Sequence, residues 1–209
     1  MNANVTSISR LLVLAVLALS ALASGCAPLI VGGAVAGGAM VAVDRRQPDI
    51  MATDERIEIQ ASDRISDKLK DQGHVNVTSY NRQVLLTGEA TTEAFKQEAE
   101  RIAQGVSEVR GVVNELQVAP PTSLGARSND AYITSVVKSR MVSANKFNTI
   151  HVKVVTEASV VYLMGMVTRK EADDATEIAR TTSGVKRVVR VFEYIQPPPA
   201  KPAAAEPAK

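Results

Sequence analysis

An internal repeat limits what this 209-residue chain can fold into more than any other feature. The stretch His74–Gly88 recurs 77 residues later as His151–Gly165, and the two copies share the histidine, the glycine and alternating valine and leucine positions. Beyond the glycine the similarity continues at a spacing of 76 residues, where Ile102-Ala103 corresponds to Ile178-Ala179. One structural module therefore occurs twice in the chain.

Each copy is small for an independent domain, at roughly 65 to 70 residues. A unit of about 60 residues buries only about 60% of the surface that its unfolded chain exposes, so its own core stabilises it weakly. The chain has one cysteine, which excludes an intrachain disulfide. We therefore expect the two modules to pack on each other or on another surface.

The pattern of the first module predicts a helix, a hairpin, a second helix and a strand. Apolar residues recur every four positions after a helix cap at Thr53 or Asp54, and Gly73 ends this helix. A polar turn over Tyr80–Gln83 joins two strands, and Gly88 ends the second of them. The remaining expected elements are a helix from Thr91 or Thr92 and a strand over Val109–Val118, and the expected core residues are Ile57, Ala61, Ile65, Leu69, Phe95, Ala99, Ile102, Ala103 and Val106.

The second module (128–195) repeats this order after a linker at Ala119–Arg127. Ser128-Asn129-Asp130 is a capping cluster for its first helix, and Thr168 with Glu171 forms a capping box at its second. The predicted fold class is α+β, with two tandem αββαβ modules, each a three-stranded mixed sheet packed against two helices. Its expected strands are Val152–Val155, Val160–Met164 and Val185–Ile195, its expected core residues are Ile133, Val137, Met141, Ala172, Ala175, Ile178 and Ala179, and the Pro/Ala-rich tail 196–209 is expected to be disordered.

The amino-terminal segment predicts export and lipid attachment. Met1–Gly25 combines a basic residue, an apolar run and small residues before the cysteine, which is typical of a secretory signal peptide. Leu22–Cys26 is similar to a bacterial lipobox, although Ala23 stands where Leu is usual. Acylation of Cys26, for example by palmitate, would anchor the protein stably, and the alternative is a free cysteine in an ordinary exported protein. Ala27, in place of Asp, is typical of sorting to the Gram-negative outer membrane.

Residues Pro28–Val43 are apolar and rich in glycine. One interpretation is a glycine-zipper transmembrane helix, but about 16 residues fall short of the roughly 20 that a spanning helix needs. Each glycine also costs about 1 kcal/mol in a helix. We favour a lipidated, membrane-associated tether over residues 26–52.

Charge distinguishes the two modules. Residues 54–118 contain 8 basic and 12 acidic side chains, for a net charge of −4, whereas residues 127–195 contain 11 and 7, for +4. Anionic headgroups attract each Lys or Arg near a membrane surface by about 1 kcal/mol. The second module would therefore face an anionic membrane.

On the first helix of the second module, Tyr132 lies at the edge of the core stripe, where an amphipathic ring suits the headgroup boundary. Lys138 and Arg140 on the same helix can snorkel. The alternative is that Tyr132 packs against the other module and the positive charge is solvated.

The order of elements resembles the BON domain, a small αββαβ module of bacterial envelope proteins. The most specific stretches are Ser128–Asp130, Met164–Thr168 and Ser183–Val188. With its two copies and lipobox, the chain is similar to dual-BON outer-membrane lipoproteins. This resemblance implies a non-enzymatic protein that binds anionic, phosphatidylglycerol-like membranes and supports envelope integrity and cell division. The resemblance assigns phospholipid binding to the following residues: Gly125, Arg127, Ser128, Asn129, Tyr132, Ile133, Val136, Lys138, Ser139, Arg140 and Val142.

The sequence gives little support to enzymatic, metal-binding or nucleic-acid functions. His74 and His151 occupy the same position in both copies, which favours a scaffold role at the strand end, and neither has a His or Cys at metal-ligand spacing. Asp173-Asp174 is best explained as a solvated surface, and no phosphate-binding glycine motif is present. We expect no cofactor and no nucleic-acid partner. A competing hypothesis is an interaction module that docks another envelope protein through the acidic first module.

Overall fold

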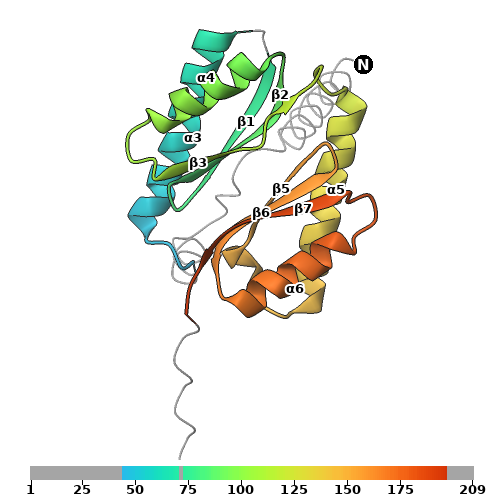
Figure 1. The fold of residues 1–209 in the computed structure, drawn as a ribbon. Coiled ribbons are helices and arrows are strands. Elements are labelled where there is room, and N and C mark those ends of the chain that lie inside the picture. The colour runs from blue at the N-terminus through green and yellow to red at the C-terminus, as the bar shows by residue number, and fades with distance from the viewer. Residues whose placement is uncertain (1–43, 71–72, 197–209) are drawn as a thin grey trace, which may run out of the picture. The chain divides into compact units, whose positions relative to one another are not determined.

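The computed structural model describes residues 44–70 and 73–196. The expected signal peptide, Cys26, the glycine-rich segment and the tail from residue 197 lie outside the described residues. Each copy of the repeat forms a small mixed sheet with two helices on one of its faces, as Figure 1 shows for α3 and α4 and for α5 and α6. This confirms the predicted α+β class and the αββαβ order.

Module one has one strand more than expected. Its elements are α3 (Pro48–Leu69), β1 (Gly73–Tyr80), β2 (Gln83–Ala90), α4 (Glu93–Gln104), β3 (Gly111–Asn114) and β4 (Gln117–Val118). β1 is antiparallel to β2, which pairs in parallel with both β3 and β4. The predicted last strand is interrupted between β3 and β4, where the backbone N–H of Leu116 donates to the side-chain oxygen of Asn114 at 3.2 Å.

Module two follows the expected pattern closely. Its elements are α5 (Leu124–Ala144), the 3-10 helix η1 (Thr149–His151), β5 (Lys153–Glu157), β6 (Val160–Val167), α6 (Arg169–Arg180) and β7 (Arg187–Tyr194). β6 is antiparallel to β5 and parallel to β7 along eight residues. The predicted capping box is present, because Thr168 accepts from the backbone of Glu171 at 3.3 Å and Glu171 accepts from the backbone of Thr168 at 2.8 Å.

The first helix of each module begins earlier than predicted. α3 begins at Pro48 rather than near Thr53, and α5 begins at Leu124 with Ser123 as its cap. Asp54 and Asp130, which we expected to cap these helices, are instead buried within them. Each carboxylate accepts two charge-assisted hydrogen bonds from backbone N–H groups in the turn of its own hairpin. The bonds are Asn81 N (2.8 Å) and Arg82 N (2.7 Å) to Asp54, and Ala158 N and Ser159 N (both 2.8 Å) to Asp130.

The repeated glycine does not end a strand, contrary to the prediction. Gly88 lies opposite Val75 inside β2, which continues to Ala90. Gly165 lies inside β6, which continues to Val167. In both modules the glycine allows a neighbouring segment to approach closely, because a Cβ atom would overlap the carbonyl group of His74 in β1 or of His151 at the end of η1.

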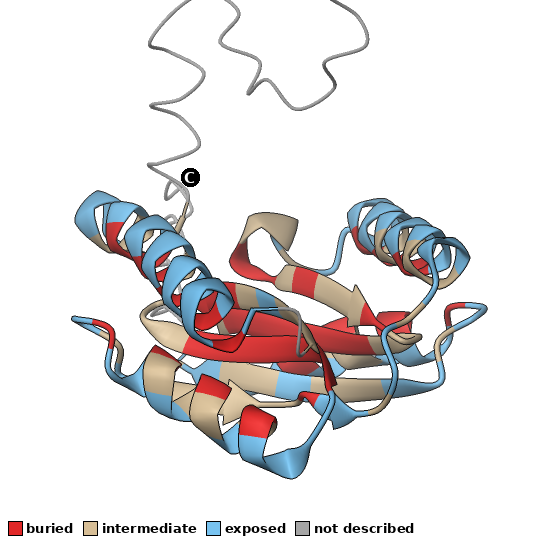
Figure 2. Ribbon diagram, turned by 90° about the horizontal axis from the view of Figure 1, so that it is seen from above, coloured by how far each residue is buried: buried red, intermediate tan, exposed pale blue. Residues whose placement is uncertain are grey.

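The modules have separate cores and one cluster in common. Each core lies between the sheet and its helices and contains the predicted apolar stripes, and Figure 2 shows buried residues concentrated there. A third cluster combines Tyr80 and Leu85 of module one with Tyr162 and Met164 of module two. The expected packing of the modules on each other is therefore found. Within residues 44–70 and 73–196, no helix is both long and apolar enough to span a bilayer.

Candidate functional site

α5 presents an uncharged, partly apolar face to solvent. Three of its side chains are large, apolar and exposed: Leu124 at 81%, Tyr132 at 67% and Val142 at 63%. At 100° per residue they share an arc of about 140° that holds no charged side chain. The outward face of α5 is defined by Leu124, Ser128, Ala131, Tyr132, Ser135, Ser139 and Val142.

The equivalent helix of module one has a different surface. The exposed positions of α3 are mostly charged, and Ile59 is its single exposed large hydrophobic residue, at 55%. Glu55 and Asp63 lie one helical turn before and after Ile59. The two modules share their core positions, so α3 and α5 differ in their exposed residues and not in how they pack in the fold.

The two basic residues assigned to α5 have different environments. Lys138 is exposed and forms no ion pair with any residue of the described chain. Arg140 donates to the carbonyl oxygen of Ile178 at 2.9 Å and to the hydroxyls of Thr182 and Thr181 at 2.6 and 3.1 Å. Its charge therefore lies at the carboxyl end of α6, where the helix dipole favours a cation. Arg140 is a structural link between α5 and α6, whereas Lys138 is an exposed cation without an ion pair among the described residues.

Ile133 was wrongly assigned to the lipid site. It is 1% exposed and belongs to the core of module two, so it cannot contact a membrane while the module is folded. Val136 is half-buried, and so is Arg127, whose Nε donates to the hydroxyl of Thr122 at 3.5 Å. The assigned residues that the structure exposes are Gly125, Ser128, Asn129, Tyr132, Lys138, Ser139 and Val142.

Leu124 is the main surface residue that the sequence interpretation missed. We placed it in the linker, whereas it is the first residue of α5 and the most exposed large apolar side chain described. The signal was Ser123, whose hydroxyl accepts from the backbone of Ala126 at 3.2 Å and so caps the helix. The exposure of Tyr132 also argues against the alternative that its ring packs on module one.

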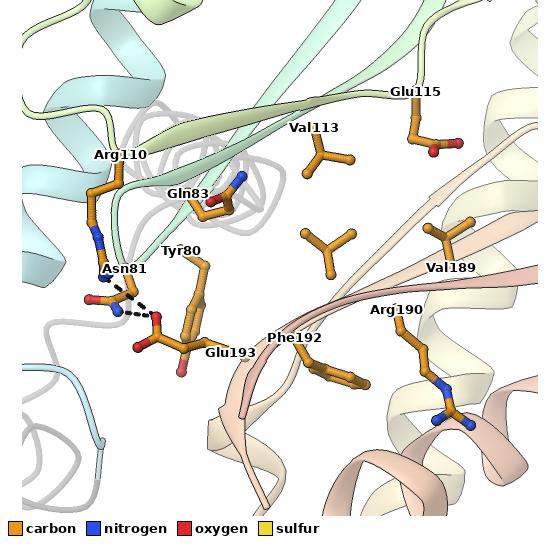
Figure 3. Close-up of a pocket in the computed structure, with 12 residues that line it drawn as sticks. Tyr80, Asn81, Gln83, Arg110, Val113, Glu115, Val189, Arg190, Phe192 and Glu193 are labelled. Carbon is orange, nitrogen blue, oxygen red and sulfur yellow. Dashed lines mark hydrogen bonds and ion pairs between the residues drawn. The ribbon is translucent and has the colours of Figure 1, made fainter. Parts of the chain in front are cut away.

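A groove of about 710 Å³ lies beside β7, lined by residues from both modules (Figure 3). Val113 and Val189 line its middle, and Glu193 at one end accepts from Asn81 at 2.6 Å and pairs with Arg110 at 3.5 Å. The lining residues bring together no nucleophile and base. The groove offers paired charges and apolar contacts.

His74 and the aspartates Asp173 and Asp174 each lie close to an oppositely charged or ionisable side chain. His74 lies opposite Glu89 in the β1–β2 ladder, with its Nδ1 3.5 Å from the carboxylate. Asp173 binds Arg190 at 2.9 Å, and Asp174 binds Lys146 at 3.1 Å. In the described ranges, no group of three or more His, Cys, Asp or Glu side chains is placed to hold a metal ion.

Comparison with known proteins identifies the family. Residues 53–120 and 129–196 each match the BON domain. The chain is 38% identical to the outer membrane lipoprotein DolP of Haemophilus influenzae over 173 residues, 82% of this chain and 89% of that protein. It is 33% identical to the 21 kDa hemolysin of Actinobacillus pleuropneumoniae over 156 residues, 74% of this chain and 80% of that one. The chain therefore belongs to the BON-domain family, as a two-module outer-membrane lipoprotein that faces the periplasm.

Proposed function

We propose that this lipoprotein binds anionic phospholipid through the outward face of α5, and that this binding supports the integrity of the envelope and a role at division sites. The observation that carries the proposal is the uncharged arc with Leu124, Tyr132 and Val142, three of the six exposed large hydrophobic residues described. This arc belongs to the module whose net charge is +4.

Physical chemistry supports a shallow, reversible mode of binding. Burial of a partly exposed apolar side chain in lipid contributes about 1–2 kcal/mol, so three such side chains suffice for weak association. Tyr132 keeps its hydroxyl at the wet headgroup level while its ring enters the acyl boundary. Lys138, which pairs with no carboxylate in residues 44–70 and 73–196, supplies attraction to an anionic headgroup. The hydroxyls of Ser128 and Ser139 on the outward face can donate hydrogen bonds to phosphate oxygens.

Vesicle flotation tests the proposal. The fragment should begin at Val43, because a fragment beginning at Thr53 would lose part of α3. We expect residues 43–209 to float with phosphatidylglycerol vesicles and far less with phosphatidylcholine vesicles. Tyr132→Glu and Val142→Glu should each reduce flotation at least tenfold, because both place a charge in the acyl boundary.

The matched control is Ile59→Glu, which adds the same charge to the equivalent helix of module one at a similarly exposed position. It should leave flotation unchanged. Equal binding to both kinds of vesicle, or equal losses in the Ile59 and Tyr132 variants, would contradict the proposal. In cells, a full-length Tyr132→Glu lipoprotein that still enriches at division sites would separate that role from lipid binding.

A second candidate function is docking of another envelope protein through module one. The observation in its favour is the exposed Ile59 between acidic residues on α3, which is unsuited to anionic lipid. A photo-crosslinking residue at position 59 should then capture one defined protein, and the same residue at position 139 should not. Equal capture from both positions would exclude this candidate.

A further inference from the structure

Two consecutive arginines near the start of the described chain bind different modules. Arg45 reaches module two, where it donates to the carbonyl oxygen of Met166 at 2.8 Å and to both carboxylate oxygens of Glu171 at 2.8 Å each. Arg46 reaches module one, where it pairs with Asp54 at 3.0 Å and stacks over the ring of Tyr80 at 4.1 Å. Neighbouring residues therefore connect elements that are far apart in the sequence.

These contacts are largely shielded from solvent. The side chains of Arg45 and Glu171 are 19% and 17% exposed, and those of Arg46 and Asp54 are 13% and 4% exposed. The carboxylate of Asp44 is 2% exposed and accepts from Arg46 at 2.9 Å. The forked geometry at Glu171 is the one in which a guanidinium binds a carboxylate most specifically. Such pairs differ from exposed surface ion pairs, which contribute little.

The acceptors are already positioned by the fold. Glu171 is held by the backbone N–H and the hydroxyl of Thr168, at 2.8 and 3.0 Å, as part of the α6 capping box. Asp54 is held by Ser79 at 2.7 Å and by the hairpin turn of module one. The two modules therefore present a preorganised surface that fits two guanidinium groups from adjacent residues.

This surface borders the cluster that joins the modules. Tyr80, beneath Arg46, is a member of that cluster together with Met164 and Tyr162. Met166, whose carbonyl binds Arg45, packs against the same cluster. Residues 44–46 thus cover one edge of the contact between the modules, while the covalent connection between them is the segment 119–123.

We propose that Asp44–Arg46 acts as a clasp, which docks on Asp54 and Tyr80 of one module and on Met166 and Glu171 of the other and so fixes the two modules in one arrangement. The clasp lies where the anchor-bearing part of the chain enters the fold. It therefore holds α5 in a constant orientation relative to that entry point. The inference extends the proposed function but rests on contacts that involve no lipid.

Distance measurement between spin labels tests the clasp in the full-length lipoprotein in detergent micelles. The labels are placed at Gln97→Cys on α4 and Ser183→Cys before β7, both exposed, and Cys26 is the only native cysteine. We expect one narrow distance distribution in the parent protein. In Arg45→Gln and Arg46→Gln it should broaden roughly twofold or more, because the modules then sample several arrangements.

Two comparison variants make the result specific. Arg56→Gln removes an exposed pair with Glu108 inside module one and should leave the distribution narrow. Arg45→Lys keeps the charge but loses the fork, and its distribution should be intermediate. Proteolysis of the segment 119–123 should accelerate about tenfold in Arg45→Gln if the modules separate.

An unchanged distribution in Arg45→Gln and Arg46→Gln would overturn the proposal, because the apolar cluster and the other polar pairs between the modules, such as Lys153 with Glu58 at 2.7 Å, would then fix the modules without the clasp. Equal broadening in Arg56→Gln would overturn it as well. Amide hydrogen exchange shows whether a glutamine variant has lost the folded core of a module. In that case the distance distribution of the folded Arg45→Lys protein decides the test, and a distribution as narrow as that of the parent would overturn the proposal. A protein with an intact clasp that does not bind vesicles would refute the proposed function and leave this inference standing.

Discussion

Gly88 approaches the backbone of His74 so closely that a Cβ atom on the glycine would lie 2.1 Å from the histidine carbonyl oxygen. Gly165 and His151 repeat the relationship at the same 2.1 Å. The His and Gly that first reveal the repeat are therefore linked by a backbone approach and not by side-chain chemistry. This explains why both copies carry glycine within a strand, where glycine is otherwise unfavourable.

Gly88→Ala should destabilise the protein by about 3 kcal/mol or more, because the methyl group would strike backbone and the native φ of +113° strains any other residue. Urea denaturation of residues 43–209 measures the change. Gly125→Ala is the matched control, because its added Cβ would have only the hydroxyl of Ser123 nearby, at 3.8 Å. Alanine there should be neutral or stabilise α5 by up to about 1 kcal/mol. Equal effects of the two substitutions would contradict this interpretation.

Asp130→Ala should lower the free energy of unfolding by about 2–3 kcal/mol, because the backbone N–H groups of Ala158 and Ser159 would lose a charged acceptor. Asp173→Ala removes an exposed carboxylate paired with Arg190 and should cost less than about 0.5 kcal/mol. Thermal and urea unfolding of both variants provide the comparison. A loss at Asp130 no larger than that at Asp173 would show that the turn does not depend on the carboxylate.

Ala158→Asn should stabilise the second hairpin by about 0.5–1 kcal/mol. Ala158 has a φ of +49° in the turn between β5 and β6, a conformation that asparagine adopts more readily than alanine. The first hairpin already has Asn81 at the equivalent turn position, with a φ of +51°. Urea denaturation measures the gain, and a destabilised variant would mean that Ala158 is required for packing.

Tyr132→Trp should increase binding to phosphatidylglycerol vesicles roughly fivefold, because the larger ring buries more apolar surface, worth about 1 kcal/mol. Tyr194→Trp changes the other exposed tyrosine, which lies at the end of β7, and should leave binding unchanged. A similar gain from both substitutions would mean that tryptophan binds vesicles regardless of its position.

The stability contributed by Glu171 should depend on pH between about 5 and 2. The hydrogen bonds from Arg45 lower the pKa of Glu171 from 4.5 to about 2. A carboxyl group with a lowered pKa stabilises the fold above its unfolded pKa, and this contribution is lost as the pH falls toward the folded pKa. Glu171→Gln should therefore be less stable than the parent by at most about 3 kcal/mol at pH 7, with the difference vanishing near pH 2.

Glu157 is the control, because its pKa is shifted in the opposite direction to that of Glu171. Burial raises the pKa of Glu157, and the negative charge of Glu89 raises it further, although the hydrogen bond from Asn76 lowers it. A carboxyl group with a raised pKa opposes folding while ionised, and this cost disappears as the pH falls. Glu157→Gln should therefore gain stability relative to the parent at pH 7 and lose that advantage in acid. Parallel pH profiles for the two variants would contradict these assignments.

The predictable parts of the fold are those with a local signature. The stripe from Ile57 to Leu69, the two hairpins and the Thr168–Glu171 capping box follow from periodicity and spacing, and all are present. The starts of α3 and α5 were misplaced because the residue types that cap helices also bind turns. Nothing local distinguishes Asp130 as a turn acceptor from Asp130 as a cap, since its partners lie 28 and 29 residues away.

The sequence was enough to propose which helix carries the candidate site and that its module is basic. It was not enough to predict which side chains of that helix are exposed. Composition separates a basic module from an acidic one, and 100° periodicity places Tyr132 at the edge of the buried stripe. Ile133 was expected in the core stripe and was also assigned to lipid by the resemblance, and its burial confirms the core position. The Arg45–Glu171 pair spans 126 positions, and such long-range contacts leave no pattern in a single sequence.

The parallel pairing of β6 with β7 along eight residues has a consequence for the timing of folding. Module one is complete once Val118 has left the export machinery, whereas the sheet of module two lacks one edge until Tyr194 has emerged. A chain that appears from its amino terminus should therefore assemble module one first. Arg46 could then bind the folded module one first, whereas Arg45 would bind only after module two has formed.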